Sequence, residues 1–334
     1  MQRKLSTRLL ATTIMALLAT GCTQSSDDGY TPEGTPRSIS FGTGVTRAAV
    51  DENKNNMQPF SVWGGCGGSH SNLFNKVEVQ PDGTYGGGAR YWVMDKMHDF
   101  YAMHPHVAGN TTWIHNTNGM LTASGFTTAA IGANAIDLMT ASATGITPTM
   151  EQPDPGPVEL HFKHELAQVK FSITAESEII INAVNLCGIA YKGDFTSAIG
   201  TTPALWEDLR YAVPGTTPFH LTPNRTVSAA DTYTPFDYLL LIPQELYATA
   251  VTDATTQETK GPATLTLTYR YANDAATVSD RTTSVTLHTT QVPKWIAGQS
   301  YNYALAIKAN TTGITLNVTI KPWEESMIDT TVDW

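Results

Sequence analysis

Two histidines in one short run are the first residues whose types and spacing could do chemistry. His161 and His164 stand three residues apart in His-Phe-Lys-His, a spacing that serves metal ligation on a helix. The run is predicted to be a strand, where residues three apart face opposite sides, so shared ligation is not expected. His164-Glu165-Leu166-Ala167-Gln168 also begins like a zinc-protease helix but lacks the second histidine. A structural role is favoured for both histidines.

Other reactive residue types form no convincing constellation. His98, His104 and His106 could bind a metal weakly, but an exposed loop is the simpler interpretation. Cys66 lies near His70 among glycines, which give flexibility rather than the electropositive setting that activates a thiol. Neither a nucleophile elbow nor a phosphate-binding glycine loop is present, and the carboxylates are scattered. The sequence predicts no enzyme activity, no cofactor and no metal site.

Aromatic residues offer the other route to a binding site. Tryptophans at the ends of alternating apolar runs could stack on sugar rings or could close a core, and the core is favoured. These tryptophans are Trp63, Trp92, Trp113, Trp206, Trp295 and Trp323.

Composition favours strands and limits the partners. The chain has 334 residues, 41% of them hydrophobic and only 15% charged, which is enough for sizeable cores in two domains. Abundant Thr, Gly and aromatic residues favour strands and turns. A formal net charge of −10 argues against nucleic acid as a partner, because phosphate binding needs a basic surface.

The amino terminus predicts export. Arg3, Lys4 and Arg8 precede an apolar run that is too short to span a bilayer, so residues 1–21 are predicted to be a signal peptide. Leu18-Ala19-Thr20-Gly21-Cys22 resembles a lipobox, with its Leu displaced by one position, and Cys22 is the predicted lipidation site. Ordinary secretion is the alternative. The lipid would hold the protein on the membrane without a spanning segment.

A polar tether follows Cys22, and two further cysteines remain. Residues 23–28, Thr-Gln-Ser-Ser-Asp-Asp, resemble the signal that sends lipoproteins of Bacteroides-type bacteria to the cell surface, although a plain linker fits equally well. Cys66 and Cys187 could form a disulfide, but the sequence cannot establish their distance. Two free thiols are preferred.

The dominant period along the mature chain is two, which predicts strands with one buried face. Apolar residues alternate with polar or small ones from Ile39 to Val45 and in several later segments, and Tyr238 to Ile242 is apolar throughout, as in a strand covered on both faces. The later alternating segments are 169–173, 265–271, 301–307 and 314–320. A weaker helical pattern covers Thr127 to Leu138 and Pro203 to Tyr211.

Prolines suggest a domain boundary. Four of them crowd the stretch from Pro148 to Pro157, which excludes both helix and central strand. The chain is therefore predicted to contain β domains at about 48–158 and 159–334, and punctuated short strands of this kind predict β-sandwiches.

The order of several motifs resembles the fimbrillin family of Bacteroides-type bacteria, across nearly the whole chain. Each motif is weak alone, and their order carries the resemblance. They are Ile39-Ser40-Phe41 with Val45-Thr46-Arg47-Ala48, Phe60-Ser61-Val62-Trp63 with Phe74 and Tyr91-Trp92, Phe100 to Pro105, Leu160 to Phe171, Leu240 to Gln244, Trp295 to Tyr303, and Ile320 to Trp323.

This resemblance implies an all-β precursor with two transthyretin-like Greek-key β-sandwich domains in tandem. In family members that polymerise, an arginine-specific protease cuts after a leader strand, and the carboxy-terminal strand of a neighbouring subunit fills the vacated groove. Here the cut would lie between Arg47 and Ala48, and the leader strand would carry Ile39, Phe41 and Val45. Burial of three such side chains is worth on the order of 5–8 kcal/mol, close to the whole stability of a domain.

The predicted location is the outer membrane, as a cell-surface lipoprotein, and a fimbrium after processing. The candidate donor-strand anchors are Met327, Ile328, Val332 and Trp334, in a tail long enough for one strand. A stalk, tip or anchor role stays open, as does an Arg47 that is never cut. The predicted partners are other fimbrial subunits, an arginine-specific protease, the outer membrane through the lipid, and surface receptors. The alternative function is a non-polymerising surface lipoprotein that binds glycans.

Overall fold

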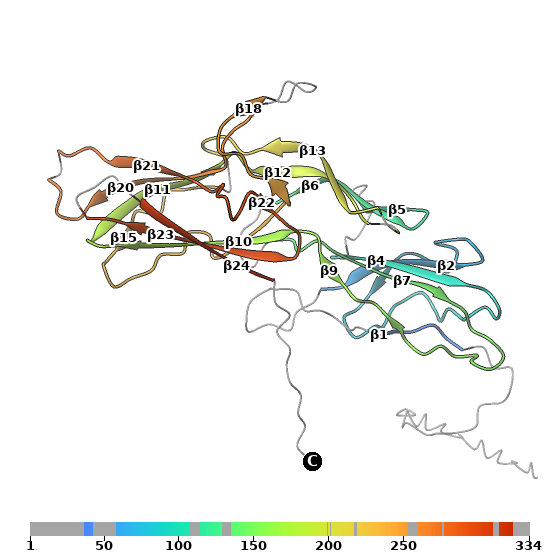
Figure 1. The fold of residues 1–334 in the computed structure, drawn as a ribbon. Helices are drawn as coiled ribbons and strands as arrows, with labels where there is room; N and C mark the ends of the chain where they lie inside the picture. Colours follow the sequence, from blue (N-terminus) through green and yellow to red (C-terminus); the bar gives the residue numbers. More distant parts are fainter. Residues whose placement is uncertain are drawn as a thin grey trace, which may run out of the picture. The chain divides into compact units, whose positions relative to one another are not determined.

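Every regular element of the described chain is a β-strand. The computed structural model describes residues 37–42, 58–106, 114–128, 135–198, 200, 202–216, 219–252, 259–275, 277–309 and 314–322. These residues belong to one compact unit that begins at Arg37. Because strands are the only regular elements within these ranges, the all-β prediction is confirmed (Figure 1). Across the same ranges, no helix has the length and apolar character needed to cross a membrane.

Two sheets in the carboxy-terminal half share the largest hydrophobic core (Figure 1). The first sheet has the order β16 (Leu239–Leu241), β10 (Ala167–Ala175), β23 (Gln299–Ile307), β24 (Ile314–Pro322). The second has the order β14 (His220–Leu221), β11 (Ile179–Cys187), β20 (Thr264–Tyr271), β21 (Arg281–Thr286), with β15 (Arg225–Val227) also on β11.

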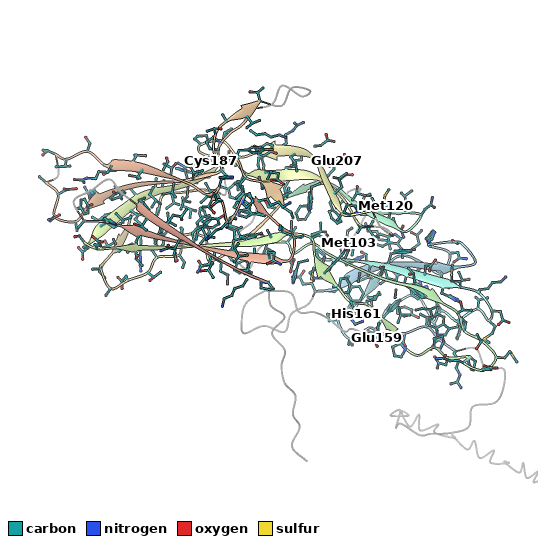
Figure 2. All side chains as sticks on the ribbon, viewed as in Figure 1. Met103, Met120, Glu159, His161, Cys187 and Glu207 are labelled. Atoms are coloured by element: carbon teal, nitrogen blue, oxygen red, sulfur yellow. The ribbon has the colours of Figure 1, made fainter. Side chains whose placement is uncertain are left out.

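The period-two pattern predicted these strands correctly. Phe171 in β10, Leu267 in β20 and Tyr303 in β23 are fully buried, while their neighbours along each strand are only partly buried or exposed. Figure 2 shows the side chains that fill the space between the two sheets. All three residues of β16 are buried, as the continuous apolar run predicted. The buried rows therefore form one core between the two sheets.

A third sheet carries the amino-terminal strands. Its order is β3 (Phe74–Val79), β2 (Phe60–Cys66), β4 (His98–His104), β7 (Met139–Ile146), β9 (Lys163–His164). Nearly every residue of β2 and β4 is buried, because both faces of this sheet are covered. Val62 belongs to the hydrophobic cluster on one face, and Trp63 belongs to the cluster on the other.

A fourth sheet joins strands from both sides of the proline-rich stretch. Its order is β13 (Leu205–Tyr211), β12 (Ala190–Thr196), β6 (Met120–Thr127), β5 (Ile114–Thr117). Pairing of β6 with β12, and of β7 with β9, links the segments before and after residue 158. The division into domains at 48–158 and 159–334 stays a prediction.

The helical interpretation of Pro203 to Tyr211 is wrong. Residues 205–211 form the strand β13, which pairs along β12. Ladder hydrogen bonds to β12 outweigh a weak local helix preference. In the other helical candidate, Thr127 ends β6 and Ala135 to Leu138 are not helical, while residues 129–134 lie outside the described residues.

Three small strand pairs complete the fold. They are β1 (Phe41–Gly42) with β8 (Val158–Glu159), β17 (Gln244–Glu245) with β22 (Lys294–Trp295), and β18 (Val251–Thr252) with β19 (Thr259–Lys260).

Candidate functional site

The predicted leader strand lies within the amino-terminal core. Ile39 is 2% exposed and Phe41 is 5% exposed, and both pack into the cluster on one face of the third sheet. Alternation places these two side chains on the same side of the strand, with Ser40 exposed between them. The expected burial of Ile39 and Phe41 is confirmed.

Aromatic rings surround Phe41. Its ring centroid lies 5.2 Å from that of Phe74, 5.8 Å from that of Phe100 and 5.9 Å from that of Tyr85, all in edge-to-face geometry. Such arrangements add roughly 0.5–1.5 kcal/mol per pair beyond the burial itself. We call the site that holds Ile39 and Phe41 the leader groove. The rings around Phe41 give this groove a position that fits an aromatic side chain.

Backbone hydrogen bonds hold the segment on both sides. On one side the amides of Val158 and Leu160 donate to the carbonyls of Ser40 (2.8 Å) and Gly42 (3.3 Å), and β1 runs parallel to β8. On the other side, the amide of Ile39 donates to the carbonyl of Arg90 (2.7 Å). The segment is thus more enclosed than a free sheet edge.

Residues 81–92 cover the segment, and we call them the clasp. The amide of Trp92 donates to the carbonyl of Arg37 (3.0 Å), and the Tyr85 hydroxyl donates to the carbonyl of Ile39 (2.7 Å). Gly83 has a φ of +83°, and a Cβ atom at this position would collide with the carbonyl oxygen of Phe41. Glycine is therefore required where the clasp crosses Phe41.

The Arg90 side chain fastens the clasp to β3. Its Nε donates to the carbonyl of Leu73 (2.7 Å), and its Nη1 donates to the carbonyls of Gly86 (3.3 Å) and Gly88 (3.2 Å). The guanidinium carbon lies 4.7 Å from the ring centroid of Phe74 and 5.2 Å from that of Tyr85. Since the Arg90 carbonyl also accepts from the leader strand, one residue links the leader, the clasp and β3.

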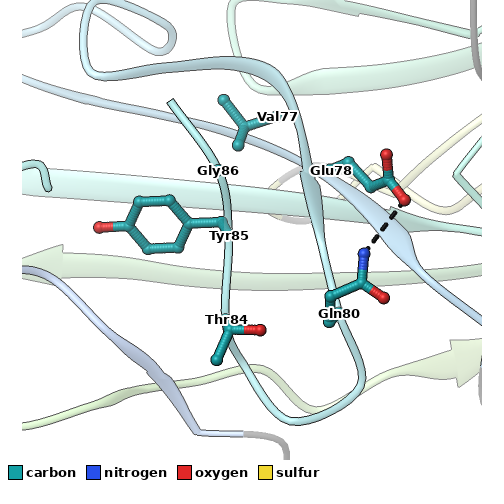
Figure 3. Close-up of a pocket in the computed structure, with 6 residues that line it drawn as sticks. All are labelled: Val77, Glu78, Gln80, Thr84, Tyr85 and Gly86. Atoms are coloured by element: carbon teal, nitrogen blue, oxygen red, sulfur yellow. Dashed lines mark hydrogen bonds between the residues drawn. The ribbon is translucent and has the colours of Figure 1, made fainter. Parts of the chain in front are cut away.

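A surface pocket of about 360 Å³ adjoins the clasp (Figure 3). The amide of Gln80 donates to the Glu78 carboxylate at 3.1 Å beside it, and the Tyr85 ring points away from this pair. Tyr85 is shared, because it lines this pocket and also contacts Ile39 and Phe41 of the leader. Its lining residues are Val77, Glu78, Gln80, Thr84, Tyr85 and Gly86.

Most of the other predicted processing residues lie outside the described residues. They are Cys22, Val45, Arg47, Ala48, Met327, Ile328, Val332 and Trp334.

Three of the histidines singled out from the sequence, His98, His104 and His164, lie within strands. His98 and His104 are buried in β4, so the exposed-loop interpretation of this cluster is wrong for both. The alternation that marks β4 is hidden because both of its faces are covered. His161 is exposed just before β9, whereas the His164 ring lies 3.0 Å from the Asp137 carboxylate. Among the described residues, no group of three or more histidine, cysteine, aspartate or glutamate side chains could hold a metal.

A buried polar cluster lies where β7 meets β9. His104 Nδ1 donates to the carbonyl of Asp137 (2.9 Å), and burial lowers the pKa of His104. The Thr140 hydroxyl donates to the Glu165 carboxylate, and burial raises the pKa of Glu165 above its ordinary value. These groups hold the strand junction together through buried polar contacts.

The tryptophans are the remaining candidates for a binding site. Trp63, Trp92 and Trp295 belong to hydrophobic cores, as favoured, and Trp206 donates from Nε1 to the carbonyl of Glu165 (3.3 Å). Trp113 and Trp323 lie outside the described residues.

Both remaining cysteines are free. Cys66 and Cys187 form no disulfide, as preferred from the sequence. Burial raises the pKa of the Cys187 thiol, which opposes nucleophilic reactivity.

The clasp was not expected from the sequence, which indicated no role for Tyr85 or Arg90. Arginine next to Tyr91-Trp92 was the available signal, but its partners come from β3 and the leader, which are remote in sequence.

Comparison with solved structures shows the same fold in other bacterial proteins. A fimbrial protein from Bacteroides vulgatus aligns with a TM-score of 0.53 and 16% identity, over 85% of this chain and 99% of that chain. A protein described as a cell adhesion protein from Bacteroides uniformis aligns with a TM-score of 0.51 and 15% identity, over 88% and 100% of the two chains. A similarly described protein from Bacteroides ovatus aligns with a TM-score of 0.52 and 14% identity, over 86% of this chain and 98% of that chain.

Sequence comparison gives the family. No curated protein matches this chain. The family model described as fimbrillin-like matches residues 46–323, which is most of the chain and begins one residue before Arg47. The leader groove and clasp thus occur in a chain that belongs to the fimbrillin-like family.

Proposed function

We propose that this protein is a fimbrial subunit or adhesin displayed on the cell surface, and that its leader strand is exchanged for a strand of another subunit after cleavage at Arg47. The observation that carries the proposal is the burial of Ile39 and Phe41 in the core, only a few residues before Arg47. Family membership, and fold neighbours described as fimbrial or cell adhesion proteins, support the same role.

The amino-terminal core needs a strand in the leader position, but that strand need not be the leader itself. Ile39 and Phe41 together contribute on the order of 3–6 kcal/mol by burial, so an empty groove would leave the amino-terminal core unstable. A new strand can supply the same kind of side chains and the same backbone hydrogen bonds. The amides of Val158, Leu160 and Trp92 are the donors that such a strand would satisfy.

Cleavage changes the competition for the groove. Before the cut, the leader is part of the same chain and outcompetes any external strand through its high effective concentration. After a cut between Arg47 and Ala48, only non-covalent contacts hold it. The carboxy-terminal segment of a neighbour, with Met327, Ile328, Val332 and Trp334, is the proposed replacement.

Surface display rests on the amino terminus. Acylated Cys22 would anchor the precursor in the outer membrane, and the polar residues that follow would place the folded part outside the cell. Removal of the segment before Ala48 would also release the subunit from this anchor, so one cut would couple detachment to assembly.

Limited proteolysis tests the proposal. The purified precursor is treated with an arginine-specific protease, and its mass and oligomeric state are followed by mass spectrometry and size-exclusion chromatography. We expect a cut after Arg47 followed by oligomers. Arg47→Ala should abolish both, whereas Arg225→Ala, at an exposed arginine of β15, should change neither.

Two results would overturn the proposal. One is a precursor that stays intact at Arg47 while other arginines are cut. The other is a chain that is cut at Arg47 and releases its leader but stays monomeric at high concentration with residues 324–334 intact.

A further inference from the structure

A polar pocket of about 490 Å³ opens on the third sheet, on the face opposite the leader strand. Alternation places its residues there. Asp99 and Tyr101 of β4 and Ser142 and Thr144 of β7 face the pocket, while Phe100 between them packs into the leader-side core. His161, labelled in Figure 2, and Lys163 of β9 line the same pocket. We call these six residues the polar pocket.

Strand pairing aligns the pocket residues in rows. Tyr101 lies opposite Ser142, and Thr140 lies opposite Lys163. Adjacent strands are about 4.8 Å apart and alternate residues are about 7 Å apart, so the surface from Asp99 to Lys163 spans roughly 10 by 13 Å. A ligand of two or three sugar rings has this length and would lie between the sheet and the remaining lining residues, which are Gly119, Leu121, Ser197, Ala198 and Gly200.

Several hydrogen-bonding groups in the pocket have no partner within the described part of the protein. The hydroxyls of Tyr101, Ser142 and Thr144 and the imidazole of His161 make no hydrogen bond there. The Tyr101 hydroxyl is protonated at neutral pH and can donate, and burial raises its pKa further. The pocket therefore presents a set of unused donors and acceptors on a concave surface.

The two charged groups of the pocket are already oriented. Asp99 Oδ1 accepts from the amide of Gly145 (2.9 Å), and Asp99 Oδ2 lies 3.9 Å from Nδ1 of His70. Lys163 Nζ lies 3.6 Å from the Glu165 carboxylate, and this ion pair offsets the lysine charge. Combined with a formal net charge of −10, this arrangement favours an uncharged ligand over an acidic one.

We propose that the polar pocket binds a neutral oligosaccharide of two or three rings, with Asp99, Tyr101, Ser142 and Thr144 as its hydrogen-bonding partners. A lipid or apolar peptide would leave these groups unpaired, at a cost for each buried group. This site does not depend on strand exchange, because the leader packs on the opposite face of the sheet.

Binding measurements on the full chain test the site. The probes are lactose, N-acetyllactosamine, maltotriose and mannotriose, with sialyllactose as the acidic comparison, followed by ligand-observed NMR and calorimetry. We expect at least one neutral probe to bind, and sialyllactose to bind more weakly than lactose. Ser142→Ala should weaken binding by about tenfold, as expected for the loss of one ligand hydrogen bond, and Ser142→Leu should abolish it by filling the pocket.

A lysine outside the pocket provides a control for loss of a lysine charge. Lys294 is 50% exposed and pairs with Glu245 at 3.7 Å, although Glu245 is 60% exposed whereas Glu165, the partner of Lys163, is 3% exposed. Because Lys163 lines the pocket and Lys294 does not, Lys163→Ala should weaken saccharide binding, whereas Lys294→Ala should not. Absence of binding by every neutral probe at millimolar concentration would overturn the site, and so would binding that survives Ser142→Leu. Neither outcome would affect the proposed strand exchange.

Discussion

The amino-terminal core and the carboxy-terminal sandwich fill their interiors in different ways. In the sandwich, long strands both form the sheets and supply the core, as in the nine-residue β23 and β24 paired along their full length. In the amino-terminal core, β1 is only two residues long, although its segment supplies two deeply buried side chains.

The leader shows that a segment can be deeply buried and yet be held by few hydrogen bonds. Phe41 is as well buried as the sandwich residues, but the leader is held by a few backbone hydrogen bonds and by the clasp. A strand in the middle of a long ladder cannot leave without breaking that ladder. A short segment under a clasp needs to break far fewer contacts, so the proposed strand exchange is expected in the amino-terminal core rather than in the sandwich.

Loss of the leader should have the largest effect and should be confined to one region. After cleavage at Arg47 and removal of the leader, we expect a loss of roughly 3–6 kcal/mol of stability in the amino-terminal core. Hydrogen exchange should show lost protection at the amides of Trp92, Val158 and Leu160, which donate to the leader. Amides of β10 and β23 should keep their protection. An equal loss in both regions would contradict the comparison.

Substitution of Gly83 should come next. Gly83→Ala places a methyl group against the Phe41 carbonyl at a φ of +83°, so the leader must shift, at a cost of about 2–4 kcal/mol. Gly88→Ala is the matched control, because its φ is +87° and no atom lies within 4 Å of the added carbon. It should cost only about 1 kcal/mol in urea denaturation. Equal losses would show that backbone strain, rather than contact with the leader, explains the glycine.

Arg90 should control how fast the leader departs. Arg90→Lys keeps the positive charge but loses the planar guanidinium that donates to three carbonyls. We expect the leader to be held less tightly by about 1–2 kcal/mol. After cleavage, a fluorescently labelled leader should dissociate roughly 5–30 times faster. Arg281→Lys is the control in the sandwich, where the guanidinium lies 4.7 Å from the Tyr271 ring centroid. A change in leader release in this control, or none in Arg90→Lys, would refute the role of the clasp.

The smallest effects should come from pH, with opposite signs at the β7–β9 junction. Burial lowers the pKa of His104, so its contribution to stability is complete above its ordinary pKa of 6.5 and is lost as the pH falls below that value. His104 faces the Asp137 and His164 side chains, so the test is made with both intact. His104→Asn should flatten the fall in unfolding free energy between pH 7 and 5.

Glu165 should show the reverse dependence. Burial raises the pKa of Glu165 above 4.5, so its contribution is present below that pH and is lost as the pH rises through the folded-state pKa. Glu165→Gln should therefore stabilise the chain at pH 7 relative to the unsubstituted protein and lose that advantage below pH 4.5. A difference that is constant across this range would show that ionisation is not involved.

Local sequence patterns predicted where the strands lie more accurately than they predicted the surroundings of individual residues. Alternation located β10, β20, β23 and β24, because one face of each strand packs into a core. It could not reveal the burial of His98 and His104, since β4 is covered on both faces. The weak helical pattern at 205–211 was overruled by pairing with β12.

The sequence by itself determined the all-β character, the buried alternation of Ile39 and Phe41, and the family. These depend on residue types at short spacings, which the chain carries locally. Only the tertiary structure decided that Gly83, Tyr85 and Arg90 close over the leader, and that a polar pocket forms on the opposite face of the same sheet. Those arrangements join residues distant in sequence, and the physical reason is that sheet pairing, rather than local preference, fixes which of them meet.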